Sequence, residues 1–180
     1  MVSVRHERPR EAAARERLLD LAYGAERFTK PSARLRAGRP PALSLVATEN
    51  GLIVGSVRLW TVAAGSSGPA LLLGPLAVHP QWRHRGIGST LVRQALQHAA
   101  RLRHGVVLLV GDAQFYGRFG FSTQKTAALS LPGLHDRDRL LALELRPGAL
   151  DRARGLISAT SAPRQQAGSA AGRAGILRAA

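Results

Sequence analysis

The chain has 180 residues, a formal net charge of +15 and a pI of about 11.9. This length suits one domain with a hydrophobic core and is short for two. Cysteine is absent, which excludes disulfides, thiolate metal ligands and a cysteine nucleophile. No apolar run reaches the length of a membrane span, and residues 1–10 lack the apolar segment of a secretory signal, so we expect a cytoplasmic protein without membrane contact.

The first half of the chain predicts a strand, two helices and a β-hairpin. Residues 2–8 suit a short strand, and residues 10–23 repeat apolar side chains at helical spacing up to Gly24, a natural helix end. A second, short helix is expected over residues 31–38, because Pro31 suits a first helical turn. Strands at 42–48 and 52–62 flank Asn50-Gly51, the strongest short signal for a hairpin turn.

The second half predicts a strand–helix–strand unit followed by a strand pair. Residues 70–78 are almost all apolar, as in a central strand that is buried on both faces. An amphipathic helix follows from Ile87 and ends near Gly105, then a strand at 106–110 and a short helix within 111–117. Residues 127–131 and 139–145 suit a last pair of strands. The element order predicts a mixed α/β sheet.

Composition changes at Asp151. The residues after it are rich in Ala, Gly, Ser and Arg and contain no further acidic residue. We therefore expect one domain over residues 1–150 and a basic, flexible tail over residues 151–180.

The stretch "QWRHRGIGST" lies between the predicted strand at 70–78 and the following helix. The first N–H groups of a helix have no intrahelical acceptor, and the helix dipole adds positive charge there. Gly86 and Gly88 let a phosphate approach the backbone, and Arg83, His84 and Arg85 add positive charge. No lysine follows Gly88, which excludes a Walker loop, and Leu91 stands where a dinucleotide fingerprint needs a third glycine. A pyrophosphate fits what remains.

Arg83-x-x-Gly86-x-Gly88 after a long apolar strand resembles the coenzyme A loop of the GNAT superfamily of N-acyltransferases. "VVLLVGDAQFYGRFGF" is similar to the next strand and helix of that superfamily, including its Tyr-x-x-x-Gly-Phe pattern at Tyr116 to Phe121. "LPGLHDRDRLLALEL" resembles the closing strands of a bacterial subgroup of uncharacterised predicted N-acetyltransferases. The resemblance covers residues 70–149.

The resemblance implies a mostly antiparallel sheet flanked by helices, with a V-shaped splay between two parallel strands, 70–78 and 106–110. It also implies that acetyl-CoA, as a co-substrate, lies in that splay. The backbone of three residues would bind its pantetheine arm, and seven residues would surround its pyrophosphate. These are Leu76, Ala77 and Val78 for the arm, and Arg83, His84, Arg85, Gly86, Ile87, Gly88 and Ser89 for the pyrophosphate. No metal is implied.

By the same resemblance, Tyr116 is the general acid that protonates the departing thiolate, although an aromatic residue packed beneath the cofactor is the alternative. A backbone N–H near Ala77 or Val78 would stabilise the oxyanion. No general base is assignable: Glu49 is expected in the solvated hairpin turn, His79 at a strand end, and Asp112 as a helix cap.

The predicted function is acetyl transfer from acetyl-CoA to a primary amine by direct attack in a ternary complex. The acceptor stays open between a small amine and a protein amine, and six basic residues hint at an acidic or phosphorylated one: Arg27, Lys30, Arg34, Arg36, His135 and Arg137. The alternative is a non-catalytic module of this fold that binds CoA, RNA or an acidic partner. Since the tail has no aromatic residue for base stacking, nucleic acid is disfavoured but stays open. Both a monomer and a homodimer are compatible.

Overall fold

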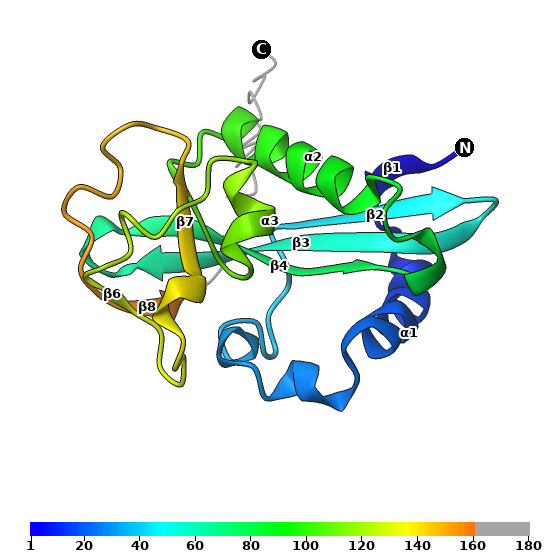
Figure 1. The fold of residues 1–180 in the computed structure, drawn as a ribbon, viewed down its shortest axis with the longest axis horizontal. Helices are drawn as coiled ribbons and strands as arrows, with labels where there is room; N and C mark the ends of the chain where they lie inside the picture. Colours follow the sequence, from blue (N-terminus) through cyan, green and yellow to red (C-terminus); the bar gives the residue numbers. More distant parts are fainter. Residues whose placement is uncertain (161–180) are drawn as a thin grey trace, which may run out of the picture.

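A computed structural model describes residues 1–160, as eight strands and three α-helices joined by short 3₁₀ turns (Figure 1). None of the helices in this range is both long and apolar enough to cross a membrane. The elements in chain order are β1 (Ser3–His6), α1 (Ala12–Tyr23), β2 (Leu43–Glu49), β3 (Leu52–Ala64), β4 (Pro69–Val78), α2 (Ile87–Arg101), β5 (Val106–Val110), α3 (Ala113–Gly117), β6 (Leu129–Ser130), β7 (Leu140–Glu144) and β8 (Gly155–Ala159).

The strands form one mixed sheet whose main order is β1-β2-β3-β4-β5-β7. Along this path every neighbouring pair is antiparallel except β4 and β5, which are parallel. The helix α2 makes the crossover between these two parallel strands, as parallel pairs require. The predicted mixed, mostly antiparallel α/β sheet is confirmed.

Side chains alternate between two buried layers along the central strands. In β4, Leu71 and Leu73 pack with α2 on one face, whereas Ala70 and Leu72 pack on the other face. Figure 1 shows α2 over one face and α1 with the following turns over the opposite face. A strand buried on both faces explains why residues 70–78 are almost continuously apolar.

The parallel strands β4 and β5 pair over a short distance only. Their register joins Leu71 to Val107 and Leu72 to Leu108. Beyond Leu72, β4 continues to Val78 and stays paired with β3 on its other side, through Leu76, Ala77 and Val78. One edge of β4 is therefore left without a strand partner in the described part of the chain, as expected for a splayed parallel pair.

Most predicted elements of the first half are confirmed, including the hairpin, whose turn has positive φ at Asn50 (49°) and Gly51 (80°). The helix predicted over 31–38 is wrong beyond its first turn. Only Pro31–Ala33 forms a 3₁₀ helix, and turns follow. Leu35 is the one buried residue of this segment, so too little apolar surface is available to hold a longer helix against the sheet.

The C-terminal part of the sheet differs from the prediction. The strands β6 and β7 do not pair with each other, because β7 pairs with β5 and β6 pairs with β8. The strand β8 also pairs with β3 and lies inside the predicted tail, so the start of the tail at Asp151 is wrong for residues 151–160. The side chain of Ile157 is buried and anchors β8 to the domain. The neighbouring residues are small or polar, so the sequence gives no clear strand pattern here. Residues 161–180 of the predicted tail lie outside the described residues.

Candidate active site

The glycine loop joins β4 to α2 and is shaped by left-handed backbone. Gly86 caps the helix at φ 74°, a conformation that disfavours any residue with a β-carbon. His84 also adopts a positive φ of 62°. The first backbone N–H of α2 with an acceptor inside the helix is that of Thr90, which donates to the Gly86 carbonyl at 3.0 Å. The N–H groups of Ile87, Gly88 and Ser89 come before it and have no acceptor in the helix. The loop thus presents free donors at the positive end of a helix dipole.

A cavity of about 660 Å³ opens at this loop, between the unpaired edge of β4, the start of α2 and α3. Eight of the ten residues predicted to bind the cofactor line it. They are Leu76, Val78, Arg83, His84, Gly86, Ile87, Gly88 and Ser89.

The other two predicted residues, Ala77 and Arg85, do not line this cavity. Ala77 is buried against α1, on the opposite face of the sheet. Arg85 points to Glu49 in the hairpin turn, where its two Nη atoms donate at 3.1 and 3.2 Å.

Glu49 fastens the loop to the hairpin. Besides Arg85, the Trp82 indole N–H donates to the same carboxylate at 2.6 Å. These donors lower the pKa of Glu49, with Trp82 the larger cause and Arg85 the second. The sequence placed Glu49 in solvent, whereas the structure makes it the anchor of the loop.

The register of β4 shows which backbone groups face the cavity. His79 N donates to Val54 O at 2.9 Å, so this is a hydrogen-bonded pair of the antiparallel ladder. Because such pairs alternate, the N–H and C=O of Ala77 point to β3, and those of Leu76 and Val78 point away from it. The Tyr23 hydroxyl donates to the Leu76 carbonyl from that free side.

Gly88 keeps the gap between β4 and α3 open. A β-carbon on it would lie 3.6 Å from Val78 Cγ2 and 3.7 Å from Phe115 Cζ, which is ordinary contact. A longer side chain would therefore fill the space beside the free donors. A narrow, glycine-lined gap between an unpaired strand edge and a helix N-terminus fits an extended chain that ends in a pyrophosphate.

Tyr116 lines this cavity, and its ring makes edge-on contacts with Phe115 and Phe121. Its hydroxyl has no hydrogen-bond partner within residues 1–160. Burial raises the pKa of Tyr116, and Tyr23 and Asp112 raise it further. The phenol is therefore protonated at neutral pH and free to donate.

The two candidate bases, His79 and Asp112, both make structural contacts. His79 Nδ1 accepts from Gln81 N at 3.3 Å and its ring stacks edge-on against Trp82. Asp112 caps α3 by accepting from the backbone N–H groups of Gln114 and Phe115 at 3.1 and 3.2 Å. Each of these residues therefore already has a structural role.

A second cavity of about 610 Å³ lies beside the first, lined by α1, the turns after it, and the strands β3, β4 and β5. The two cavities share Tyr23, Leu76, Asp112 and Tyr116 as lining residues. Sequence reasoning missed Tyr23, which it used only as the end of a helix. Of the six basic residues singled out, Arg27, Lys30, Arg34 and Arg36 line this cavity, whereas His135 and Arg137 do not.

Comparison with known proteins agrees with this geometry. A family model described as an acetyltransferase (GNAT) domain matches residues 40–123. The uncharacterised N-acetyltransferase YjhQ of Escherichia coli K12 is 38% identical over 84 residues, which span 45% of this chain and 46% of YjhQ. A second uncharacterised N-acetyltransferase of that strain, YhbS, is 30% identical over 120 residues, or 66% of this chain and 72% of YhbS.

Two solved structures are similar over most of the chain. The structure of E. coli YhbS in complex with CoA has a TM-score of 0.75 at 26% identity and covers 88% of this chain and 89% of its own. A GNAT acetyltransferase from Brucella melitensis in complex with acetyl-CoA has a TM-score of 0.69 at 26% identity, with 89% and 96% covered.

Proposed function

The chain belongs to the GNAT family of N-acetyltransferases, and we propose that it transfers the acetyl group of acetyl-CoA to a primary amine by direct attack in a ternary complex. The observation that carries this proposal is the pair of adjoining cavities that share Tyr116 and the edge of β4. Two substrates can then meet at one boundary, and no covalent enzyme intermediate is needed.

The first cavity is the coenzyme site. The N–H groups of Ile87, Gly88 and Ser89 hold the pyrophosphate at the start of α2, and Arg83 adds positive charge. The Leu76 N–H and the Val78 C=O, which point away from β3, bind the pantetheine arm as an added strand would. Complexes of two similar proteins with CoA and acetyl-CoA support this placement.

Acetyl-CoA supplies an acetyl group activated as a thioester. The Val78 N–H points into the coenzyme cavity, where it donates to the carbonyl oxygen as negative charge develops. The alternation of β4 favours Val78 over Ala77 for this role, since the Ala77 N–H faces β3.

Tyr116 is the proton donor to the leaving thiolate. Its hydroxyl is unpaired in the described structure and lies at the boundary of both cavities. Because burial raises its pKa, the phenol is protonated across the neutral range when acetyl-CoA binds, and it transfers this proton to sulfur as the C–S bond breaks.

Loss of the amine proton proceeds through water. The acidic residues that line the second cavity are Glu16 and Asp112, and both are occupied: Asp112 caps α3, and Glu16 pairs with Arg15 and Arg27. The cations around this cavity lower the pKa of a bound ammonium, because a like charge disfavours the charged form. A dedicated carboxylate base is then unnecessary.

A panel of primary amines with acetyl-CoA, followed by release of free thiol, tests the proposal. Turnover that depends on an added amine, and that falls about 10²-fold in Tyr116→Phe with acetyl-CoA affinity retained, would support it. Binding of acetyl-CoA without thiol release for any amine would favour the non-catalytic alternative instead.

A further inference from the structure

The second cavity is strongly basic, and its cations fall into two groups. Its charged lining residues are Glu16, Arg27, Lys30, Arg34, Arg36, Arg58, Asp112 and Arg139. Six positive charges therefore face two negative ones, and the question is which of the six are already neutralised by the protein.

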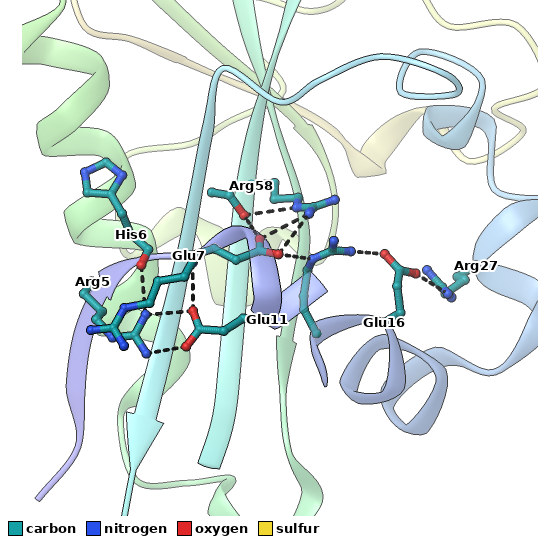
Figure 2. Close-up of polar contacts among 10 residues, drawn as sticks. Arg5, His6, Glu7, Glu11, Glu16, Arg27 and Arg58 are labelled. Carbon is teal, nitrogen blue, oxygen red and sulfur yellow. Dashed lines mark hydrogen bonds and ion pairs between the residues drawn. The ribbon is translucent and has the colours of Figure 1, made fainter. Parts of the chain in front are cut away.

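Arg27 and Arg58 are neutralised by a network of ion pairs that joins β3, α1 and the segments directly after β1 and α1 (Figure 2). Glu7 accepts from Arg58 at 3.2 Å and from the buried Arg15 at 2.9 Å. Glu16 accepts from Arg27 at 2.6 Å. Figure 2 shows Glu7 beside Arg58 and Glu16 beside Arg27. These two arginines support the wall of the cavity and have little charge left for a ligand.

Lys30, Arg34, Arg36 and Arg139 have no ion-pair partner among residues 1–160. The Lys30 ammonium lies 4.3 Å from the centre of the Tyr23 ring. Partial burial lowers the pKa of Lys30, and the charges of Arg139 and Arg36 lower it further. These three cations line one cavity, and although the Glu26 charge partly opposes the lowering of the Lys30 pKa, none of them forms an ion pair in the described chain. Such like charges are unfavourable together unless a ligand supplies an anion.

Arg36 is the best placed of the four to hold a ligand. It is half-buried, and its Nε donates to the Ser32 carbonyl at 3.1 Å, which fixes the direction of the side chain. Neither of its Nη atoms has a hydrogen-bond partner in the described part of the chain. An oriented guanidinium with free Nη donors matches the planar geometry of a carboxylate or a phosphate.

We propose that the second cavity binds an acceptor amine that also carries a carboxylate or phosphate group, held by Arg36 with Lys30 and Arg139. This inference rests on the proposed function for the identity of the cavity as the acceptor site. The anionic group satisfies the uncompensated cations and directs the amine toward the boundary at Tyr116. Acceptors without an anion leave these cations unpaired, and the cavity then disfavours a positively charged amine.

Calorimetric titration of the CoA-loaded protein with matched amines tests this binding directly, without turnover. The probes are O-phosphoethanolamine against ethanolamine and β-alanine against propylamine, at one fixed ionic strength because salt screens such contacts. We expect the anionic member of at least one pair to bind at least tenfold more tightly. The pair that shows the larger preference distinguishes phosphate from carboxylate.

Two variants locate the anion. Arg36→Gln is expected to reduce the preference to about threefold or less, and Arg17→Gln, an exposed arginine of α1 outside both cavities, should keep it. If Arg36→Gln fails to bind CoA, the binding preference can be measured in Arg139→Gln instead, because Arg139 is at an exposed position. Equal binding of the probes with and without an anionic group, or an unchanged preference in Arg36→Gln and Arg139→Gln, would overturn the proposal.

Thiol release with the same amines separates the two proposals. A tenfold binding preference without thiol release contradicts acetyl transfer but leaves the anion site in place. Equal rates of thiol release with amines that carry an anionic group and amines that lack one, together with no binding preference, overturn the anion site and support the transferase.

Discussion

The ring of Tyr116 lies directly on Gly111, the residue that follows β5. A β-carbon at this position would come within 2.4 Å of Tyr116 Cε2 and 2.8 Å of Cδ2. Gly111 therefore sets the position of the one side chain to which we assign proton donation, although it has no functional group of its own.

Gly111→Ala is accordingly expected to move the Tyr116 ring and to lower kcat about as far as Tyr116→Phe does, roughly 10²-fold. Crowding at this site should also destabilise the fold by about 1–3 kcal/mol. Steady-state kinetics with a fixed amine measures the first effect and thermal unfolding the second. Gly117→Ala is the matched control, because its β-carbon would meet no atom within 4 Å. Full activity in Gly111→Ala would contradict the role of Tyr116.

Replacing single amides of β4 with esters distinguishes the N–H groups that face the coenzyme cavity from those that pair with β3. An α-hydroxy acid at Val78 removes an N–H that faces the coenzyme cavity, and we expect kcat to fall about 10²-fold with little change in stability. The same replacement at Ala77 removes an N–H that faces β3 and should cost roughly 1 kcal/mol of stability while kcat is retained. The reverse pattern would show that our assignment of the ladder is wrong.

The pairing of Glu49 with Trp82 and Arg85 predicts a pH-dependent stability. The pKa of Glu49 is lowered in the folded protein, so its contribution is present above the unfolded value of about 4.3 and is lost as the pH falls through the folded value. Glu49→Gln should therefore lower Tm at pH 7 and have a smaller effect near pH 3.

Glu49→Gln should also weaken acetyl-CoA binding several-fold at pH 7, since the loop loses its anchor. Glu26→Gln, whose carboxylate is exposed and makes no hydrogen bond or ion pair in the described structure, is the control. An equal Tm difference for Glu49→Gln at pH 3 and pH 7 would argue against the ion pair.

The strand β8 predicts that residues after Asp151 stabilise the domain. Ile157 is 3% exposed and Leu156 is 59% exposed. Ile157→Ala should cost about 2–4 kcal/mol and Leu156→Ala less than about 0.5 kcal/mol, by denaturant unfolding. Similar values for the two variants would mean that β8 is not part of the cooperative fold.

Much of the fold was predictable because single elements leave local signals. Asn50-Gly51 fixed the hairpin, and the apolar run of β4 followed by Gly86 located the crossover helix. The strand β8 gave no such signal, since Ile157 pairs with Ala64 of β3 and is buried in a cluster that includes Val62 and Ala64, which are distant in the sequence. Pairing partners of short strands depend on contacts of this kind, which is why β6 and β7 were wrongly paired.

In the candidate site, too, some features follow from the local sequence and others depend on the fold. Backbone features such as the glycine loop follow from the local sequence, and eight of the ten predicted binding residues line one cavity. The direction of a side chain does not follow: Arg85 turns to Glu49, and Ala77 turns to α1. Tyr23 was missed because only the fold brings the end of α1 to the Leu76 carbonyl.

The most direct test of the central claim is calorimetric titration of acetyl-CoA into the wild type, Gly88→Gln and Gly88→Glu. Gly88 suits this test better than Gly86, because its backbone is not in the left-handed region and a side chain there enters the coenzyme cavity. We expect micromolar binding to the wild type, weaker binding to Gly88→Gln because of side-chain size, and a further loss of at least tenfold in Gly88→Glu through repulsion of the pyrophosphate. Absence of acetyl-CoA binding to the folded wild type, or equal binding to all three proteins, would contradict it.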